Sequence, residues 1–337
     1  MINIVPIQKD VRSSDFDALF TVAKAKAVKE FHESLPGYEA TPLRELSALA
    51  KHVGLKNLFV KDESYRFELN AFKGLGGSYA LAEVIATKLN ITPAEVKNVE
   101  PNSFTFVTAT DGNHGRGIAW AAKNLKQQAV VYMPKGSAVE RLENIRKLGA
   151  TAEITELNYD DTVRFAKSQG DANGWILVQD TAWPGYEEIP GWIMQGYMTM
   201  ALEAVQSLGD IVPTHIFLQA GVGAMAGLCC GEVCTVGWEQ IRQFGDYSVS
   251  CDDKVAADGM RVLGNPLYGD EQIISGESGA VTTGLVYRLM VDADKAPMRS
   301  ELGLNEESVV LCISTEGDTD TVNYRRIVWD GACGLIK

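Results

Sequence analysis

The sequence predicts an α/β fold in which mainly parallel sheet is covered by helices. From about residue 55 onward, short apolar runs alternate with longer helical patterns, and this alternation favours βαβ units. Three polar or glycine-rich segments directly follow expected strands, at 108–115, 179–181 and 219–227. Because ligands of open parallel sheets bind at the carboxyl ends of strands, the same pattern also predicts a ligand site.

The expected elements can be justified in chain order. The expected strands are short runs, most of them apolar and most with β-branched or aromatic residues. These runs lie at 57–60, 104–108, 129–133, 151–156, 175–178 and 215–218. The expected helices lie at 71–89, 114–125, 138–148, 160–168 and 191–208. The first helix has small residues near its start, and the third ends at Gly149, a residue that often follows a helix.

Length and composition narrow the class of protein. The 337 residues suffice for one large domain or two ordinary ones, and the hydrophobic share of 46% is typical of globular proteins. The chain has no apolar stretch long enough to span a bilayer, and its start lacks the features of a signal peptide. We therefore expect a cytoplasmic protein without a membrane partner. The net charge of −13 argues against nucleic acid as a partner.

Cysteine and histidine give no sign of a metal site. There are six cysteines, four histidines and no Cys-x-x-Cys pair, whereas a structural zinc site needs about four closely spaced ligands. We expect reduced, mostly buried thiols. A redox role for the cluster of Cys229, Cys230 and Cys234 is the alternative.

The glycine-rich loop at 221–227 joins an expected strand to a helix. Glycines allow backbone N–H groups to approach an anion, and a helix N-terminus attracts negative charge. We therefore expect the loop to bind a phosphate group. A tight turn without a ligand is the alternative.

Lys73 lies among small and apolar residues at an expected helix start. Burial and a helix N-terminus both lower the pKa of a lysine, and an uncharged amine is the form that attacks an aldehyde. We therefore expect a nucleophilic lysine held uncharged. For an isolated lysine, exposure at the surface would be the better interpretation.

Four segments resemble those that surround the cofactor in pyridoxal-phosphate (PLP) enzymes of fold type II. They are 61–78 around Lys73, 110–115, 221–227 and 313–317. In this order they resemble the Schiff-base segment, the asparagine loop, the phosphate cup and the late strand whose hydroxyl meets the pyridine nitrogen. Within that group, the chain is similar to the diaminopropionate ammonia-lyase family over nearly its whole length. Long strings carry this likeness, at 111–117, 132–138, 158–164, 179–183, 192–197, 264–266, 274–280 and 314–320.

The resemblance implies two domains, each with a mainly parallel, helix-covered sheet, and pyridoxal 5'-phosphate in the cleft between them. Residues 1–77 and 186–337 would form the large cofactor-binding domain and 78–185 the small domain. Two departures stand out. Glu68 occupies a position at which the family usually has glycine, and a block of roughly fifty residues, a large part of a typical domain, is missing after Gly227. Since its loss would leave a hole in the sheet, we interpret it as a mobile segment left out of the sequence rather than a true deletion.

The resemblance also implies roles for single residues. Lys73 would form the Schiff base and, once released, act as a base at Cα. Asp111 is the expected second base, and Asp180 would act there too or hold the substrate's β-ammonium group, with helix capping as the alternative for either aspartate. His114 and Glu277 could line the site or serve in packing and capping. The residues expected to bind the cofactor are Lys73, Phe72, Asn113, Gly221, Val222, Gly223, Ala224, Met225, Ser314 and Thr315.

The implied reaction is α,β-elimination of 2,3-diaminopropionate, in the D form, the L form or both, to pyruvate and two ammonia by a homodimer. A neutral Ser314 or Thr315 hydroxyl at the pyridine nitrogen would favour elimination over transamination. The alternatives are a serine or threonine dehydratase, a β-replacement synthase and a non-catalytic small-molecule sensor on the same scaffold.

Overall fold

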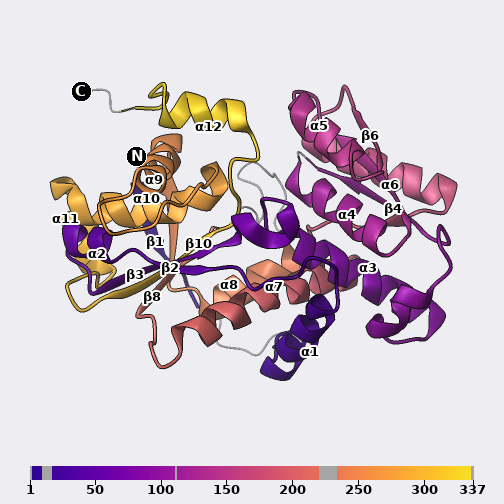
Figure 1. The fold of residues 1–337 in the computed structure, drawn as a ribbon, viewed down its shortest axis with the longest axis horizontal. Helices are drawn as coiled ribbons and strands as arrows, with labels where there is room; N and C mark the ends of the chain where they lie inside the picture. Colours follow the sequence, from indigo (N-terminus) through magenta and orange to yellow (C-terminus); the bar gives the residue numbers. More distant parts are fainter. Residues whose placement is uncertain (1, 10–16, 111, 220–233, 335–337) are drawn as a thin grey trace.

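The computed structural model describes residues 2–9, 17–110, 112–219 and 234–334. Within these ranges the strands form two four-stranded sheets and one two-stranded sheet. Figure 1 shows the two larger sheets in separate lobes, with helix α3 (Lys73–Leu89) lying between them. Residues of α3 pack against α4 in one lobe and α7 in the other, so this helix connects the two cores.

The smaller lobe contains a fully parallel sheet with the strand order β6-β5-β4-β7. Its strands are β4 (Thr105–Ala109), β5 (Gln128–Met133), β6 (Thr151–Ile154) and β7 (Ile176–Leu177). The helices between them are α4 (Asn113–Asn124), α5 (Val139–Arg146) and α6 (Tyr159–Asn173). Parallel strands need such crossover helices, and the apolar strand residues are buried between them.

The larger lobe contains a sheet with the strand order β2-β3-β10-β8. Its strands are β2 (Leu43–Glu45), β3 (Asn57–Asp62), β8 (His215–Phe217) and β10 (Val309–Ser314). Strand β10 is parallel to both neighbours, and all six of its residues are buried. Only β2 is antiparallel in this sheet. Since β3 ends at Asp62 and β10 at Ser314, their carboxyl ends lie side by side and face the start of α3.

Helices and a short ribbon complete the larger lobe. The ribbon is the antiparallel pair β1 (Ile2–Pro6) and β9 (Tyr247–Cys251). The helices before the glycine loop are α1 (Val22–Glu33), α2 (Ser47–Val53) and α7 (Glu188–Leu208). Those after it are α8 (Thr235–Phe244), α9 (Asp253–Gly264), α10 (Glu277–Val291), α11 (Ala296–Glu301) and α12 (Thr321–Val328). Short 3-10 helices lie at Asp17–Leu19, Glu63–Glu68, Pro93–Asn98 and Ala293–Lys295.

The predicted architecture of mainly parallel, helix-covered sheet is confirmed. Every strand and helix expected between residues 57 and 218 is present. The main differences are at helix ends: α6 runs to Asn173 rather than to about 168, and α5 stops at Arg146, before Gly149. The sheets divide the strands as the expected domain boundaries at 77/78 and 185/186 do, although those boundaries stay a prediction. The position of the missing block, after Gly227, lies outside the described residues.

Candidate active site

Lys73 is the first residue of α3, and two backbone contacts fix its place beside β10. The N–H of Phe72 donates to the carbonyl oxygen of Thr315 at 3.1 Å, and Ala71 forms an isolated antiparallel bridge with Glu316. The lysine is only 7% exposed. Glycines allow the neighbouring helices to approach this closely: a Cβ at Gly117 of α4 would lie 2.8 Å from the carbonyl carbon of Lys73.

The ammonium of Lys73 is paired with a buried carboxylate. Its Nζ lies 2.8 Å from Oδ2 of Asp180, a residue that follows β7. Burial alone would lower the pKa of Lys73, but the charge of Asp180 outweighs it and raises the pKa above the usual value. Burial would likewise raise the pKa of Asp180, but His114 and Lys73 hold it below its usual range. The expectation of an uncharged Lys73 is therefore wrong for the protein without cofactor, because the carboxylate of Asp180 stabilises the charged amine. The sequence alone did not reveal this ion pair.

Two aromatic rings surround the lysine. Its Nζ lies 5.3 Å from the ring centre of Phe72 and 5.7 Å from that of Tyr197, on α7. The centres of these two rings lie 4.5 Å apart. Burial raises the pKa of Tyr197 to about 12, so its hydroxyl keeps its proton at neutral pH. The walls are thus apolar, while the hydroxyl is a neutral polar group beside the amine.

The first turn of α4 lies between two buried carboxyl groups. Nδ1 of His114 lies 3.7 Å from Asp180, while its Nε2 bonds to the carbonyl oxygen of Val178 at 2.9 Å. On the other side, the amide of Asn113 donates to Glu316. Burial raises the pKa of Glu316, and this side chain also accepts a hydrogen bond from Thr319 at 3.1 Å. Asn113 therefore connects the small lobe to the turn after β10, whereas His114 binds the segment that follows β7.

A hydroxyl pair lies at the end of β10. Oγ of Ser314 donates to Oγ of Ser275 at 2.8 Å, and both residues are fully buried. Thr315 is also buried, and its backbone carbonyl accepts the N–H of Phe72. Of the two residues expected to offer a hydroxyl, Ser314 is thus the one with a hydrogen-bonded hydroxyl group.

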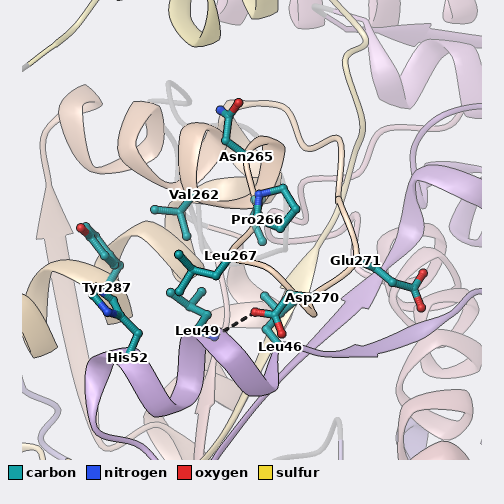
Figure 2. A pocket seen from close by; sticks show the side chains of 11 residues that line it. Leu46, Leu49, His52, Val262, Asn265, Pro266, Leu267, Asp270, Glu271 and Tyr287 are labelled. Atoms are coloured by element: carbon teal, nitrogen blue, oxygen red, sulfur yellow. Dashed lines mark hydrogen bonds between the residues drawn. The ribbon is translucent and has the colours of Figure 1, made fainter.

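The loop before Ser275 is held against α2 by a hydrogen bond of Asp270, which Figure 2 shows. Both carboxylate oxygens of Asp270 accept backbone N–H groups at the start of α2, from Ala48 and Leu49, at 2.8 Å each. The N-cap residue of this helix is Leu46, which has no side-chain acceptor, so Asp270 supplies the missing cap. Glu277 begins α10 and accepts a hydrogen bond from Asn323 on α12, which is a structural contact.

Several expected site residues lie outside the described part of the chain. They are Asp111, the expected second base, and Gly221, Val222, Gly223, Ala224 and Met225, expected to hold the phosphate. Cys229 and Cys230 lie outside it too, whereas Cys234 is buried and accepts the N–H of Ala182 through its sulfur at 3.4 Å. Within the described ranges, no group of His, Cys, Asp or Glu could hold a metal ion, and no helix is long and apolar enough to cross a membrane.

Sequence reasoning missed three contributors to the site: Tyr197, Glu316 and Ser275. Tyr197 occurs in the middle of an apolar helix, where a tyrosine signals only packing. All three residues belong to strings that carried the family resemblance. Their spacing gave no hint that Ala71 pairs with Glu316 or that Ser314 bonds to Ser275, because these contacts join segments that are far apart in the chain.

The described donor set fits the aldehyde and ring end of pyridoxal 5'-phosphate. A buried primary amine can bind the aldehyde, apolar rings can pack on the pyridine, and an amide and a neutral hydroxyl flank the same space. The phosphate end depends on 221–225. Chemically, the arrangement offers one buried ammonium and one buried carboxylate paired at 2.8 Å.

Comparison with known proteins identifies the family. A family model described as pyridoxal-phosphate dependent enzyme matches residues 35–231. The diaminopropionate ammonia-lyase of Escherichia coli strain K12 is 45% identical over 370 residues, which cover 93% of each chain. The mouse L-serine dehydratase/L-threonine deaminase is 26% identical over 217 residues, covering 62% of this chain and 58% of that protein.

Solved structures agree. The E. coli diaminopropionate ammonia-lyase, in complex with an aminoacrylate-PLP azomethine reaction intermediate, matches with a TM-score of 0.94 and 43% identity. The match covers 99% of this chain and 98% of that chain.

The alignment with the E. coli K12 protein also bears on the missing block. It spans 370 positions and covers 93% of this chain, which is about 313 of 337 residues, so about 57 positions have no counterpart here. That number is close to the expected block of roughly fifty residues, whose placement after Gly227 stays a prediction.

The match to the family model, the 45% identity over nearly the whole chain and the position of the buried lysine lead to one conclusion. The chain belongs to the pyridoxal-phosphate dependent enzymes and, among them, to the diaminopropionate ammonia-lyase family.

Proposed function

We propose that this protein catalyses the PLP-dependent α,β-elimination of 2,3-diaminopropionate, D, L or both, with water, to pyruvate and two ammonia. The observation that carries the proposal is the buried pair of Lys73 and Asp180, 2.8 Å apart beside the carboxyl end of β10. Relatives at 45% identity bear the name of this activity. The reaction balances, since diaminopropionate and one water contain the atoms of pyruvate and two ammonia.

Lys73 has two tasks in this proposal. Its amine holds the cofactor, and once the substrate has taken its place, Nζ accepts the proton from Cα. The bound cofactor would supply an electron-withdrawing ring that stabilises negative charge at Cα. A positioned general base of this kind contributes about 10²–10⁴ in rate.

Asp180 is the natural partner of the β-ammonium group. It already binds one ammonium, that of Lys73, and its low pKa keeps it ionised at neutral pH. Charge-assisted hydrogen bonds are the strong kind, so the same carboxylate can hold the substrate's second amine close to Nζ. Asp111 is the proposed base on the opposite face, which would allow both D and L substrates to react.

The Ser314 hydroxyl gives the pyridine nitrogen a neutral partner. With no carboxylate there, the nitrogen need not be protonated, and a weaker electron sink favours elimination over transamination. Asn113 is proposed to bond the cofactor's 3'-oxygen, and residues 221–225 its phosphate.

A direct test compares substrates at steady state. We expect purified enzyme to release pyruvate and ammonia in a 1:2 ratio from D- or L-diaminopropionate, far faster than from serine or threonine, and Lys73→Ala to abolish the reaction. Preference for serine or threonine would support the dehydratase alternative, to which the mouse relative points at lower identity and coverage. A new amino acid on addition of sulfide would indicate a synthase. Cofactor binding without any turnover would indicate a sensor.

The proposal includes a homodimer, which the family resemblance implies, in the cytoplasm. Light scattering coupled to size exclusion tests the assembly. A mass near twice 36.6 kDa is expected, and a single-chain mass would contradict it.

A further inference from the structure

Four charged side chains form a closed network inside the large lobe, away from the amine. They are Lys61 on β3, Glu63 and Arg66 just after it, and Glu203 on α7. Each side chain is at most 1% exposed. Lys61 Nζ lies 2.6 Å from Oε2 of Glu203, Arg66 Nη2 lies 2.7 Å from the same oxygen, and Arg66 Nε lies 2.9 Å from Glu63. Two cations and two anions therefore balance.

Neutral partners complete the network. Thr41 donates its hydroxyl to Glu63 and accepts from Lys61 through its carbonyl, and Tyr38 donates to Glu203 at 2.8 Å. Burial alone would raise the pKa of Glu203, but Arg66 and Lys61 lower it to about 2. Removing one member of such a buried network is strongly destabilising, because the charge left over stays uncompensated.

The network borders the strained segment that leads to the lysine. Three residues that are not glycine have left-handed backbone conformations there: Phe67 with φ 52°, Glu68 with φ 58° and Asn70 with φ 56°. Such residues persist only where the surroundings impose the conformation. At one end of this segment, the guanidinium of Arg66 is fixed by Glu63 and Glu203.

The other end is fixed by the turn after β10. The N–H of Gly317 donates to the carbonyl oxygen of Asn70 at 2.9 Å, and the amide of Asn70 donates to Asp318 at 3.0 Å. Between the two ends, Phe67 and Leu69 pack directly against Gly74, where a Cβ would lie 2.8 Å from Leu69 and 3.1 Å from Phe67. The backbone of Lys73 is thus set by the left-handed segment.

We propose that the network of Lys61, Glu63, Arg66 and Glu203 is a positioning device that holds Phe67, Glu68 and Asn70 in their left-handed conformations, so that Nζ of Lys73 reaches the cofactor aldehyde. The inference rests on the proposed function of Lys73 as the cofactor-binding amine. Arg66 and Glu203 are positioning residues, since neither contacts the reacting atoms.

The experiment uses Glu203→Gln, the charge-balanced double variant Lys61→Met/Glu203→Gln, and Asp258→Asn as control. Asp258 pairs with Arg288 at 2.6 Å and lies on α9, which Figure 1 shows away from α3, so we expect its loss to destabilise the fold without changing the segment. Arg66→Lys is the second single variant, because it keeps the charge but loses the guanidinium fork.

Two readouts separate positioning from general stability. The first is amide hydrogen exchange of residues 66–73 in the protein without cofactor, and the second is the rate at which added pyridoxal 5'-phosphate becomes reducibly linked to Lys73. For Glu203→Gln, and for Arg66→Lys should the former not fold, we expect faster exchange in this segment and linkage slower by about a hundredfold, the cost of a misplacement of about 1 Å. The double variant should link within about threefold of the wild-type rate, since its charges balance again.

The outcomes are distinct. Equal linkage rates in wild type, Arg66→Lys and Glu203→Gln, or an equal slowing in Asp258→Asn at the same loss of Tm, would overturn the positioning role. A double variant as slow as Glu203→Gln would also overturn it. A wild-type protein that forms no link at Lys73 would instead overturn the proposed function.

Discussion

Replacing Asp180 by asparagine should have opposite effects on cofactor binding and on turnover. In the protein without cofactor, Asp180 stabilises the charged form of Lys73, and the charged form cannot attack an aldehyde. Asp180→Asn keeps the shape of the side chain and removes its charge. Burial then dominates the pKa of Lys73 and favours the uncharged amine.

The size of the effect follows from the geometry. Two unit charges 2.8 Å apart attract by about 6 kcal/mol at an effective dielectric constant of about 20. Both groups are less than a tenth exposed, so water screens them little. Even if only a third of this energy is lost, about 2 kcal/mol, the uncharged fraction of the amine at neutral pH rises about thirtyfold.

The assay is the rate of linkage between Lys73 and pyridoxal 5'-phosphate, followed by absorbance from pH 6 to 10 in wild type and Asp180→Asn. The linkage rate of wild type should rise with pH throughout this range. The linkage rate of the variant should be at least about thirtyfold higher near neutral pH and should level off at a lower pH than that of wild type. Turnover of diaminopropionate should fall by about tenfold to a hundredfold, because the variant loses a charge-assisted hydrogen bond to the β-ammonium group. Parallel pH profiles with equal rates would refute the reasoning, because the ion pair would then not control the amine.

Three further predictions concern stability. Glu68→Gly should raise the free energy of unfolding by about 1 kcal/mol, because glycine adopts the φ of 58° without strain; chemical denaturation measures it, and a loss would contradict it. Asp270→Ala should lower that energy by about 1–2 kcal/mol through the lost cap of α2, whereas an unchanged denaturation midpoint would mean that the cap contributes nothing. The Asp180–Lys73 pair should contribute stability at a constant level between about pH 4 and pH 10, because the pKa of Asp180 is lowered and that of Lys73 raised. The Tm difference between wild type and Asp180→Asn should therefore be largest between about pH 5 and 7 and shrink as the pH rises toward 10, because the buried Lys73 of the variant loses its proton in that range and wild-type Lys73 does not; a difference that stays constant up to pH 10 would contradict the assignment.

Local patterns predicted the fold well between residues 57 and 218. Buried parallel strands such as β4 and β5 are short apolar runs, and the helix α4 begins shortly after β4, so the alternation of apolar runs and helical patterns was informative. The outer elements were not foreseen. Strand β2 has only three residues and β1 pairs with β9 across most of the chain, so neither has a local signature.

The site could be predicted only in part. The resemblance led to Lys73, Asp180, Asn113 and Ser314, and the structure brings Lys73 together with Asp180, and Asn113 with the turn after Ser314. It could not reveal the charged state of Lys73, because the pKa depends on a contact between residues 107 positions apart. The glycine that the family usually has at the position of Glu68 is consistent with a left-handed backbone, and Glu68 has this conformation.

The most direct test of the account is to locate the covalent link. The protein is incubated with pyridoxal 5'-phosphate, reduced with borohydride, digested and analysed by mass spectrometry, with Lys73→Ala in parallel. One phosphopyridoxyl group on the peptide that contains Lys73, and none in the variant, is the predicted result. A label on another lysine, or equal labelling of the variant, would contradict the assignment of this amine as the centre of the site.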